Sequence, residues 1–209
     1  MARCVIVGGA EIKDYESIKK HFRPDDFYIF CDGGLFHEKP LGVSANLIVG
    51  DFDSHEKPER ECEIISLPRA KDDTDTFFAA KEALRRGYSD FLLIGVVGGR
   101  LDHTFGNLSI LLMFHSKGAN AMLIDDFSEM EIVDSTPKYI DDSYPYFSVI
   151  NIDGSPRGIT IEDALFPLQN ADILPDYQYG ISNEPIRGKR ASVKVNSGQV
   201  LLIKVKKAQ

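Results

Sequence analysis

Residues 47–54 read LIVGDFDS, and this stretch decides the expected fold. The apolar run before Gly50 is typical of a strand that is buried on both faces in a parallel sheet. Gly50 breaks the run where the backbone must turn, and Asp51 and Asp53 follow two residues apart. Such side chains point the same way in an extended segment, so the carboxylates repel each other unless a cation or a proton separates them. The pattern indicates a site for a hard divalent cation, Mg²⁺ above all, with a polar capping turn as the alternative.

Composition limits the class of protein. The chain has 209 residues, 43% of them hydrophobic and 27% charged, which suits one large globular domain or two small ones. Its formal net charge of -8 argues against a nucleic-acid surface. No apolar stretch is long enough to span a bilayer, and no signal peptide is visible, so we expect no membrane partner and a cytoplasmic location. Cys4, Cys31 and Cys62 lack zinc-ligand spacing and are expected to be buried free thiols.

Strands and helices alternate in the first part of the sequence. Apolar runs predict strands at residues 4–7, 27–31, 47–49, 63–66, 91–97 and 121–124. Helical spacing of apolar residues falls between them, at residues 15–22, 77–84 and 105–115. This alternation predicts an α/β domain over residues 1–134 with a mostly parallel, Rossmann-like sheet. Ligands of such sheets bind beyond the carboxyl ends of the strands, where Asp32, Asp51, Asp53 and Asp102 are expected to meet.

The pattern changes after residue 134, where helical spacing disappears and Pro, Gly, Asn and Tyr become frequent. Short strands are predicted at residues 146–150, 158–161, 191–195 and 200–205. The triplet Asn196-Ser197-Gly198 predicts a hairpin turn between the last two strands. We therefore expect a second, smaller all-β domain over residues 135–209, built as a sandwich or a small barrel.

Two polar segments follow predicted strands of the first domain. Asp32 precedes two glycines, which let a ligand approach the backbone closely; a simple tight turn is the alternative. Residues 98–103 read GGRLDH and resemble a phosphate cradle at a helix N-terminus. Arg100 is the candidate for bidentate phosphate binding, whereas His103 is expected to be structural. The segment is neither a P-loop nor a dinucleotide-binding motif.

A third polar segment, residues 71–76, reads KDDTDT and precedes a predicted helix. Acidic residues are favoured at helix N-termini, so capping is the alternative to a binding role. Capping accounts for one or two of the acids, but not for three acids together with a lysine.

In this order, the motifs DGG (32–34), GDFDS (50–54), KDDTDT (71–76) and GGRLDH (98–103) resemble those of the thiamin pyrophosphokinase family. FPL (166–168) and GISNE (180–184) extend the resemblance into the second domain. Each motif is weak alone, but together they cover nearly the whole chain. The resemblance implies a thiamine diphosphokinase, a transferase that moves a diphosphoryl group from ATP to thiamin and releases AMP. It also implies a homodimer with composite sites, in which a nucleotide-binding α/β domain is followed by a β-sandwich domain for thiamin binding and dimerisation.

The resemblance also implies roles for single residues. The expected Mg²⁺ ligands are Asp51, Asp53, Asp72 and Asp75. The expected catalytic residues are Asp51, Asp53, Asp75 and Asp102. ATP and its phosphates are expected to contact Asp32, Gly33, Lys71, Asp72, Thr74 and Arg100. Thiamin is expected to contact Ser182 and Asn183. Some family members place a tryptophan near thiamin, but this chain has none, which leaves Phe166, Tyr177 and Tyr179 as the candidate aromatic residues.

The expected reaction is physically consistent with the composition. The hydroxyl oxygen of thiamin would attack the β-phosphorus of ATP with AMP leaving in line, a transfer catalysed mainly by positioning and charge stabilisation. Mg²⁺ would reconcile an acidic chain with an anionic substrate. The alternatives are a metal-dependent phosphohydrolase, a pyrophosphokinase for a pterin-type acceptor, and a non-catalytic nucleotide sensor.

Overall fold

The computed structural model describes residues 2–52, 61–70 and 72–206. The chain forms two compact units, Met1–Asp126 and Phe127–Gln209. The division falls before the expected boundary at residue 134, because strand β7 (Ser128–Val133) pairs with β13 (Val200–Val205) of the second unit. The architecture is the expected mixture of a large, mostly parallel sheet and antiparallel strands.

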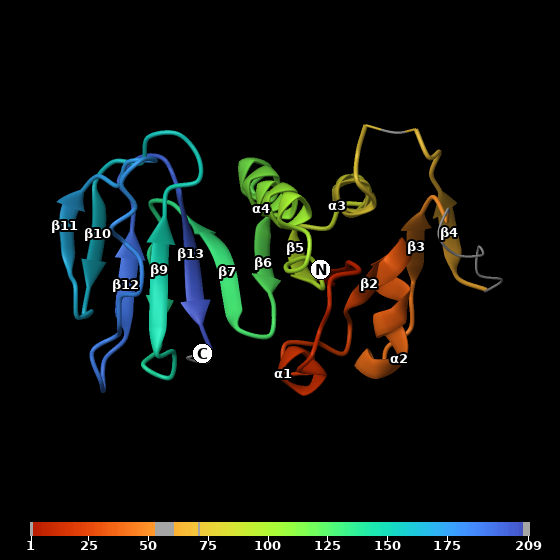
Figure 1. The fold of residues 1–209 in the computed structure, drawn as a ribbon, viewed down its shortest axis with the longest axis horizontal. Coiled ribbons are helices and arrows are strands. Elements are labelled where there is room, and N and C mark those ends of the chain that lie inside the picture. The colour runs from red at the N-terminus through yellow and green to blue at the C-terminus, as the bar shows by residue number, and fades with distance from the viewer. Residues whose placement is uncertain (1, 53–60, 71, 207–209) are drawn as a thin grey trace. The chain divides into compact units, whose positions relative to one another are not determined.

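Parallel strands form the centre of the first unit (Figure 1). Each strand pairs in parallel with its neighbours. The order across the sheet is β4 (Glu63–Ser66), β3 (Leu47–Gly50), β2 (Phe27–Cys31), β1 (Cys4–Val7), β5 (Asp90–Ile94) and β6 (Asn120–Ile124). Every residue of the central strand β1 is buried, as expected for an apolar run covered on both faces.

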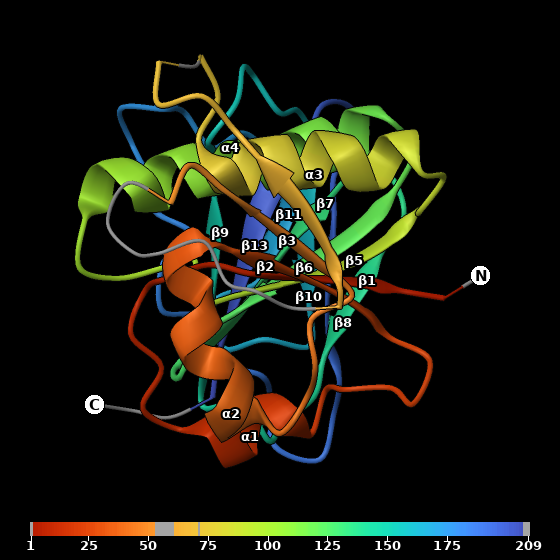
Figure 2. The same cartoon turned by 90° about the vertical axis from the view of Figure 1, so that its right-hand side faces the viewer.

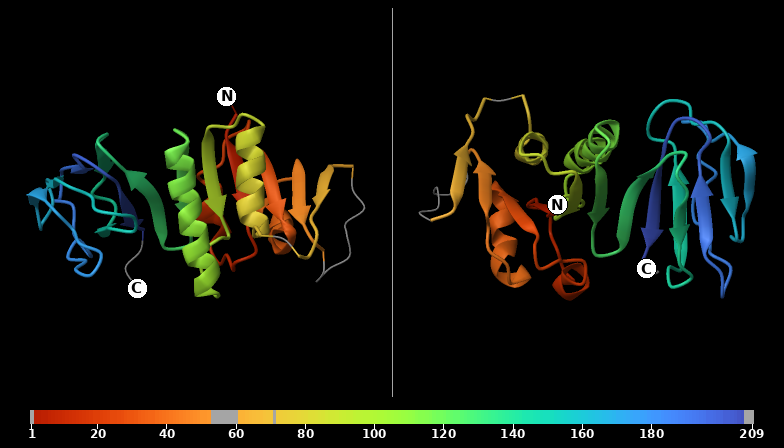
Figure 3. Two further views of the ribbon diagram at one scale, coloured as in Figure 1. Left: turned by 90° about the horizontal axis from the view of Figure 1, so that it is seen from above. Right: turned by 180° about the vertical axis from the view of Figure 1, so that it is seen from behind.

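Helices cover both faces of this sheet (Figure 2). On one face lie α3 (Asp75–Arg85) and α4 (Leu101–Ser116), which run side by side (Figure 3). The other face carries α1 (Tyr15–Lys19) and α2 (Glu38–Leu41), and a 3₁₀ helix, η1 (Asp32–His37), links β2 to α2. Buried alanines of α3, Ala79, Ala80 and Ala83, let that helix pack close to the strands.

The second unit contains two groups of antiparallel strands, which belong to different sheets. One group has the order β7, β13 and β9 (Tyr146–Ile150). The other has the order β11 (Leu168–Ala171), β10 (Ile159–Glu162), β12 (Ala191–Lys194) and β8 (Lys138–Ile140). Both sheets contribute side chains to one buried apolar cluster, for example Val193 from β12 and Leu202 from β13. Exposed Lys194 follows buried Val193, which is the alternation expected of a half-buried strand.

The prediction of a hairpin turn at residues 196–198 is wrong. Strands β12 and β13 lie in different sheets, so the connection carries the chain from one sheet to the other. Its backbone pairs instead with Arg157, whose N–H donates to the carbonyl of Ser197 at 2.8 Å. A turn sequence specifies a reversal of the chain, but it does not specify the strand that receives it.

Two smaller expectations concern the cysteines and membrane-spanning helices. Cys4 and Cys31 are buried free thiols, as expected, and Cys62 is a free thiol that is half-buried. None of the helices in the described part of the chain combines the length and the apolar character needed to cross a bilayer.

Candidate active site

Turns at the carboxyl edge of the parallel sheet pack backbone against backbone. The N–H of Gly8 donates to Ile94 O at 2.9 Å, just beyond β1 and β5. A Cβ on Gly34 would lie only 2.3 Å from Val7 O, so only glycine fits at that position. The turns that follow β1, β2 and β5 therefore converge on one small region.

Three carboxylates from separate segments meet at this edge. Asp32 begins η1, Asp51 follows β3, and Asp75 begins α3. One carboxylate oxygen from each lies within 4.8 Å of the others, and all three residues are half-buried. Mutual repulsion at such distances favours a bound cation or proton, and hard oxygen ligands suit Mg²⁺. The donor set therefore fits the divalent ion that the sequence predicts.

The acid cluster overlaps the predicted metal set only in part. Asp51 and Asp75 belong to it, and Asp32, expected as a phosphate contact, completes it. Asp72 is exposed and is not a member. Asp53 and Lys71 lie outside the described residues.

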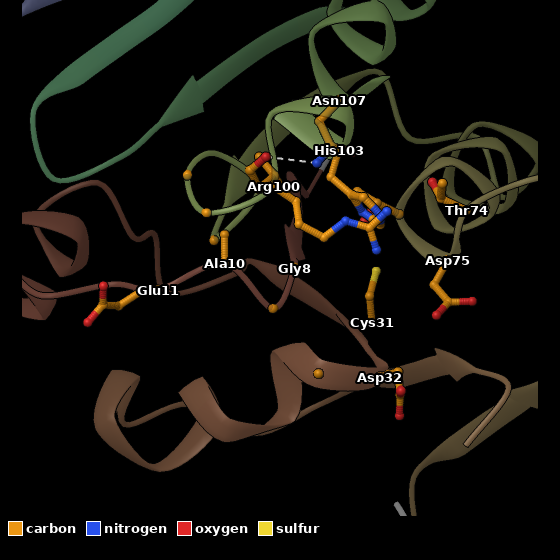
Figure 4. A pocket seen from close by; sticks show the side chains of 17 residues that line it. Gly8, Ala10, Glu11, Cys31, Asp32, Thr74, Asp75, Arg100, His103 and Asn107 are labelled. Carbon is orange, nitrogen blue, oxygen red and sulfur yellow. Dashed lines mark hydrogen bonds between the residues drawn. The ribbon is translucent and has the colours of Figure 1, made fainter. Parts of the chain in front are cut away.

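A cavity of about 420 Å³ adjoins the cluster (Figure 4). Asp32 and Asp75 reach it from η1 and α3, and the turn after β1 forms another part of its wall. Its lining residues are Gly8, Gly9, Ala10, Glu11, Cys31, Asp32, Gly33, Thr74, Asp75, Thr76, Gly95, Val96, Gly98, Gly99, Arg100, His103 and Asn107. The predicted residues Gly33, Thr74 and Arg100 are thus brought together with two of the acids.

The start of α3 combines capping with a place in the cavity wall. Thr74 caps the helix, because its Oγ1 accepts the N–H of Phe77 at 3.2 Å. Asp75 is the first helical residue, a position where a carboxylate is stabilised by the helix dipole. Asp73 has a different role, because its carboxylate forms an ion pair with Lys81 Nζ at 2.6 Å. Capping therefore accounts for Thr74, and the neighbouring acids divide between the cluster and an ion pair.

Arg100 and Asp102 form an exposed ion pair at the start of α4. Arg100 donates from Nε to Asp102 Oδ1 at 3.2 Å and from Nη2 to Asp102 Oδ2 at 2.5 Å. The guanidinium lowers the pKa of Asp102 to about 2. Their side chains are 71% and 63% exposed, and only Arg100 lines the cavity. Asp102 therefore lies outside the three-acid cluster and contacts the residue predicted to bind phosphate.

Sequence reasoning missed part of the cavity wall. The turn at Gly8 and Gly9 follows a strand just as the motif at Asp32 does, and this shared position could have revealed it. Asn107 donates from Nδ2 to Val96 O at 2.8 Å and is the polar member of the buried residues of α4. Cys31 lies at the end of β2, where burial raises the pKa of its thiol to about 12 and keeps it protonated.

The second unit has an apolar pocket of its own, of about 250 Å³. Its lining residues are Ile161, Phe166, Leu168, Tyr179, Gly180, Ile181 and Asn183. Of the two predicted thiamin contacts, Asn183 lines this pocket and Ser182 does not. The Ser182 backbone adopts a left-handed conformation, with φ of 57°, and its N–H donates to Ser148 Oγ at 3.1 Å.

Asn183 holds the chain segment that carries Phe166. Its Oδ1 accepts the N–H of Phe166 at 3.0 Å and that of Glu184 at 2.9 Å, and its Nδ2 donates to Phe166 O at 2.7 Å. Asn183 is only 3% exposed, whereas Phe166 is 60% exposed. The amide therefore fixes the backbone beneath an exposed aromatic ring at the edge of the pocket.

Comparison with known proteins identifies the family. The family model for the thiamin pyrophosphokinase catalytic domain matches residues 18–123, and that for the vitamin B1 binding domain matches residues 132–200. A curated thiamine pyrophosphokinase of Bacillus subtilis is 28% identical over 170 residues, which cover 78% of this chain and 79% of that protein.

Solved structures agree with these matches. The crystal structure of thiamine pyrophosphokinase from Bacillus subtilis has a TM-score of 0.85 at 24% identity, covering 99% of this chain and 100% of that one. The structure from Geobacillus thermodenitrificans has a TM-score of 0.84 at 23% identity, with 99% of both chains covered. These two likenesses concern the fold, and the family models add the sequence evidence. The chain belongs to the thiamin pyrophosphokinase family.

Proposed function

We infer that the chain carries out the reaction of its family, the transfer of the diphosphoryl group of ATP to the hydroxyl of thiamin with release of AMP. The function predicted from the motifs is confirmed by both family matches, which give no support to the phosphohydrolase, pterin-type or sensor alternatives. The observation that carries the assignment of a site is the group of three acids beside the cavity at the carboxyl edge of the parallel sheet.

Asp32, Asp51 and Asp75 are the residues that would hold Mg²⁺. When bound, the ion supplies positive charge for the phosphate oxygens of ATP, which the acidic chain would otherwise repel. Asp32 and Asp75 begin helices and Asp51 directly follows β3, so regular structure positions the carboxylates before substrate binds, as charge stabilisation requires.

The phosphates occupy the part of the cavity beside these acids. Gly33 lets them approach the backbone, and Thr74 retains its hydroxyl hydrogen for donation because its oxygen accepts the cap bond. Arg100 presents a planar donor group already ordered by Asp102. Asp102 acts through Arg100 in this assignment.

Thiamin binds at the apolar pocket of the second unit. Phe166 is the aromatic residue that stacks on a thiamin ring, because its ring is exposed and its backbone is held on both sides by Asn183. Tyr179 is less available, since its hydroxyl donates to Asp172 O at 2.7 Å and its ring lies 5.2 Å from that of Tyr177. Asn183 is a positioning residue in this assignment.

The working enzyme is a cytoplasmic homodimer whose second unit is a β-sandwich. Each site combines the acids of one subunit with the apolar pocket of its partner. Chains carrying Asp51→Asn and chains carrying Phe166→Ala should therefore complement each other. With random exchange of equal amounts, half of the dimers carry one intact site. At thiamin concentrations well below KM, where Phe166→Ala homodimers contribute little, activity should therefore recover to about a quarter of wild type. No recovery despite proven exchange would mean that each chain builds its own site.

Product analysis tests the reaction itself. The purified chain is incubated with Mg²⁺ and ATP, with and without thiamin, and nucleotides and thiamin esters are separated. AMP and thiamin diphosphate should appear in equal amounts and only with thiamin. Phosphate release without thiamin would favour a hydrolase instead.

A further inference from the structure

His37, at the end of η1, is a buried group that the assignment above does not use. It is 6% exposed and joins two other parts of the chain. Its Nε2 lies 2.9 Å from Ala10 O, and its Nδ1 lies 2.8 Å from the hydroxyl of Tyr15. A carbonyl oxygen can only accept, so Nε2 carries the proton and Nδ1 accepts the Tyr15 hydroxyl.

A neutral imidazole satisfies this arrangement. Burial lowers the pKa of His37, which keeps the ring uncharged at neutral pH. A neutral ring with one donor and one acceptor matches its two partners completely. In this neutral ring, Nε2 donates to Ala10 O.

The partner of His37 lies in the wall of the candidate ATP cavity. Residues 8–11 form that wall, and the N–H of Ala10 already donates to Gly95 O at 2.8 Å. The carbonyl of Ala10 is held from the other side by His37. Both backbone polar groups of Ala10 are thus used, the N–H by the residue that follows β5 and the carbonyl by the last residue of η1.

The same wall touches the start of η1. A Cβ on Gly9 would lie 3.0 Å from the carbonyl carbon of Gly33, so the two segments approach at backbone distance. Asp32 of the acid cluster directly precedes Gly33. A displacement of residues 8–11 from η1 would therefore change the width of the cavity beside the acids.

We propose that His37 is a positioning residue for the nucleotide, which holds the wall of residues 8–11 at the separation from η1 that ATP requires. This inference rests on the assignment of the cavity to ATP. Tyr15 supports it by forming a hydrogen bond with the other ring nitrogen, Nδ1, at 2.8 Å. The expected consequence of losing the bond is weaker ATP binding with little change in the chemical step or in the use of thiamin.

The test compares His37→Leu with His37→Gln. Leucine removes the donor, whereas the glutamine Nε2 can still donate to Ala10 O. Calorimetry gives the Kd for ATP with Mg²⁺, and kinetics give kcat and the KM values for ATP and thiamin. For His37→Leu we expect the Kd and KM for ATP to rise about fivefold to tenfold, as for one lost hydrogen bond. For His37→Gln, the Kd and KM for ATP should stay within about twofold of the wild-type values.

Leu41→Ala is the matched control for general destabilisation. Leu41 is buried in α2 within the apolar cluster on the same face of the sheet, and no side-chain bond ties it to residues 8–11. This variant should lower Tm but leave ATP binding unchanged well below Tm. The proposal is overturned if His37→Leu binds ATP like wild type, if glutamine does not rescue, or if Leu41→Ala loses the same ATP affinity. A different result would overturn the proposed function alone. In that case the wild-type chain binds ATP and His37→Leu weakens this binding, but the wild-type chain forms no thiamin diphosphate.

Discussion

The cavity beside the acid cluster and the apolar pocket of the second unit differ in chemistry as much as the two units differ in sheet type. The cavity of the first unit is lined by acids and glycines, and the pocket of the second unit is lined mostly by apolar and aromatic side chains. One suits metal-bound phosphates, and the other suits the ring of an organic substrate. Neither pocket alone has the groups for both substrates.

Sheet topology explains part of this difference. All strands of the parallel sheet end at the same edge, so residues as distant in sequence as Asp32, Asp51 and Asp75 meet there. Antiparallel strands alternate in direction and gather no such edge. In the second unit the pocket instead relies on a connection, where Asn183 fixes the segment of Phe166.

The largest effect is expected from removing one acid of the first pocket. Asp51→Asn should lower kcat about 100-fold or more at saturating Mg²⁺, because one preorganised charge is lost. Adding Asp75→Asn should cost much less than the product of the two single effects, since the acids act as a unit. Steady-state kinetics over a range of Mg²⁺ concentrations measure both.

Asp73→Asn is the matched control for that experiment. Asp73 lies in the same acidic segment but pairs with Lys81 outside the cluster. Near-normal turnover of Asp51→Asn, or an equal loss in Asp73→Asn, would contradict the assignment of the cluster.

A substitution in the apolar pocket of the second unit should change the KM for thiamin. Phe166→Ala should raise the KM for thiamin about tenfold through loss of an aromatic contact, with the KM for ATP unchanged. Leu165→Ala is the control, because Leu165 is also exposed but does not line the pocket. If the two variants behave alike, exposed apolar area rather than the Phe166 ring determines thiamin affinity.

A smaller effect is expected at Arg100. Arg100→Lys should raise the KM for ATP about fivefold, because lysine cannot reproduce the planar pair of donors. Arg157→Lys changes a comparable exposed pair in the second unit, with Asp172, and should leave ATP kinetics unchanged. Unaltered ATP kinetics in Arg100→Lys would remove Arg100 from the phosphate site.

Much of the first unit could be predicted from the sequence because most of its strands are short apolar runs that end at or just before Gly or Asp. The bounds of β1, β2 and β4 match those expected. The strand expected at 91–97 ends instead at Ile94, because Gly95 adopts a left-handed φ of 61°. That glycine could have been recognised as the end of the strand.

Other elements depend on partners distant in sequence. Strand β7 contains Glu129 and Glu131, which are buried beside Lys204 of β13 at 3.1 and 3.2 Å, so its pattern does not read as apolar. Strand β11, with the sequence LQNA, is likewise defined by pairing with β10 rather than by its own residues. Candidate site residues could be named from motifs. Only the three-dimensional arrangement shows that Asp32, and not Asp72, belongs to the acid cluster.

The smallest expected effect concerns stability at the end of α3 remote from Asp75. Hydrogen bonds from Arg85, with further ones from Arg86, lower the pKa of Glu82 from 4.5 to about 2. A carboxylate with a lowered folded-state pKa stabilises the fold fully above pH 4.5, and this contribution is lost as pH falls toward 2. Because Arg85 is largely exposed, solvent screening reduces the contribution to about 1 kcal/mol.

Glu82→Gln should therefore lower the free energy of unfolding by about 1 kcal/mol at pH 7, and by much less at pH 3, in urea titrations. Glu16→Gln, which breaks the exposed pair with Lys19, should change it by no more than about 0.5 kcal/mol at either pH. Both variants should keep wild-type kcat, since neither residue lines either pocket. A difference between Glu82→Gln and wild type that is the same at both pH values would mean that the lost interaction is packing rather than charge. A fall in kcat for Glu82→Gln would mean that the start of α3, and with it Asp75, depends on the ion pairs at the other end of the helix.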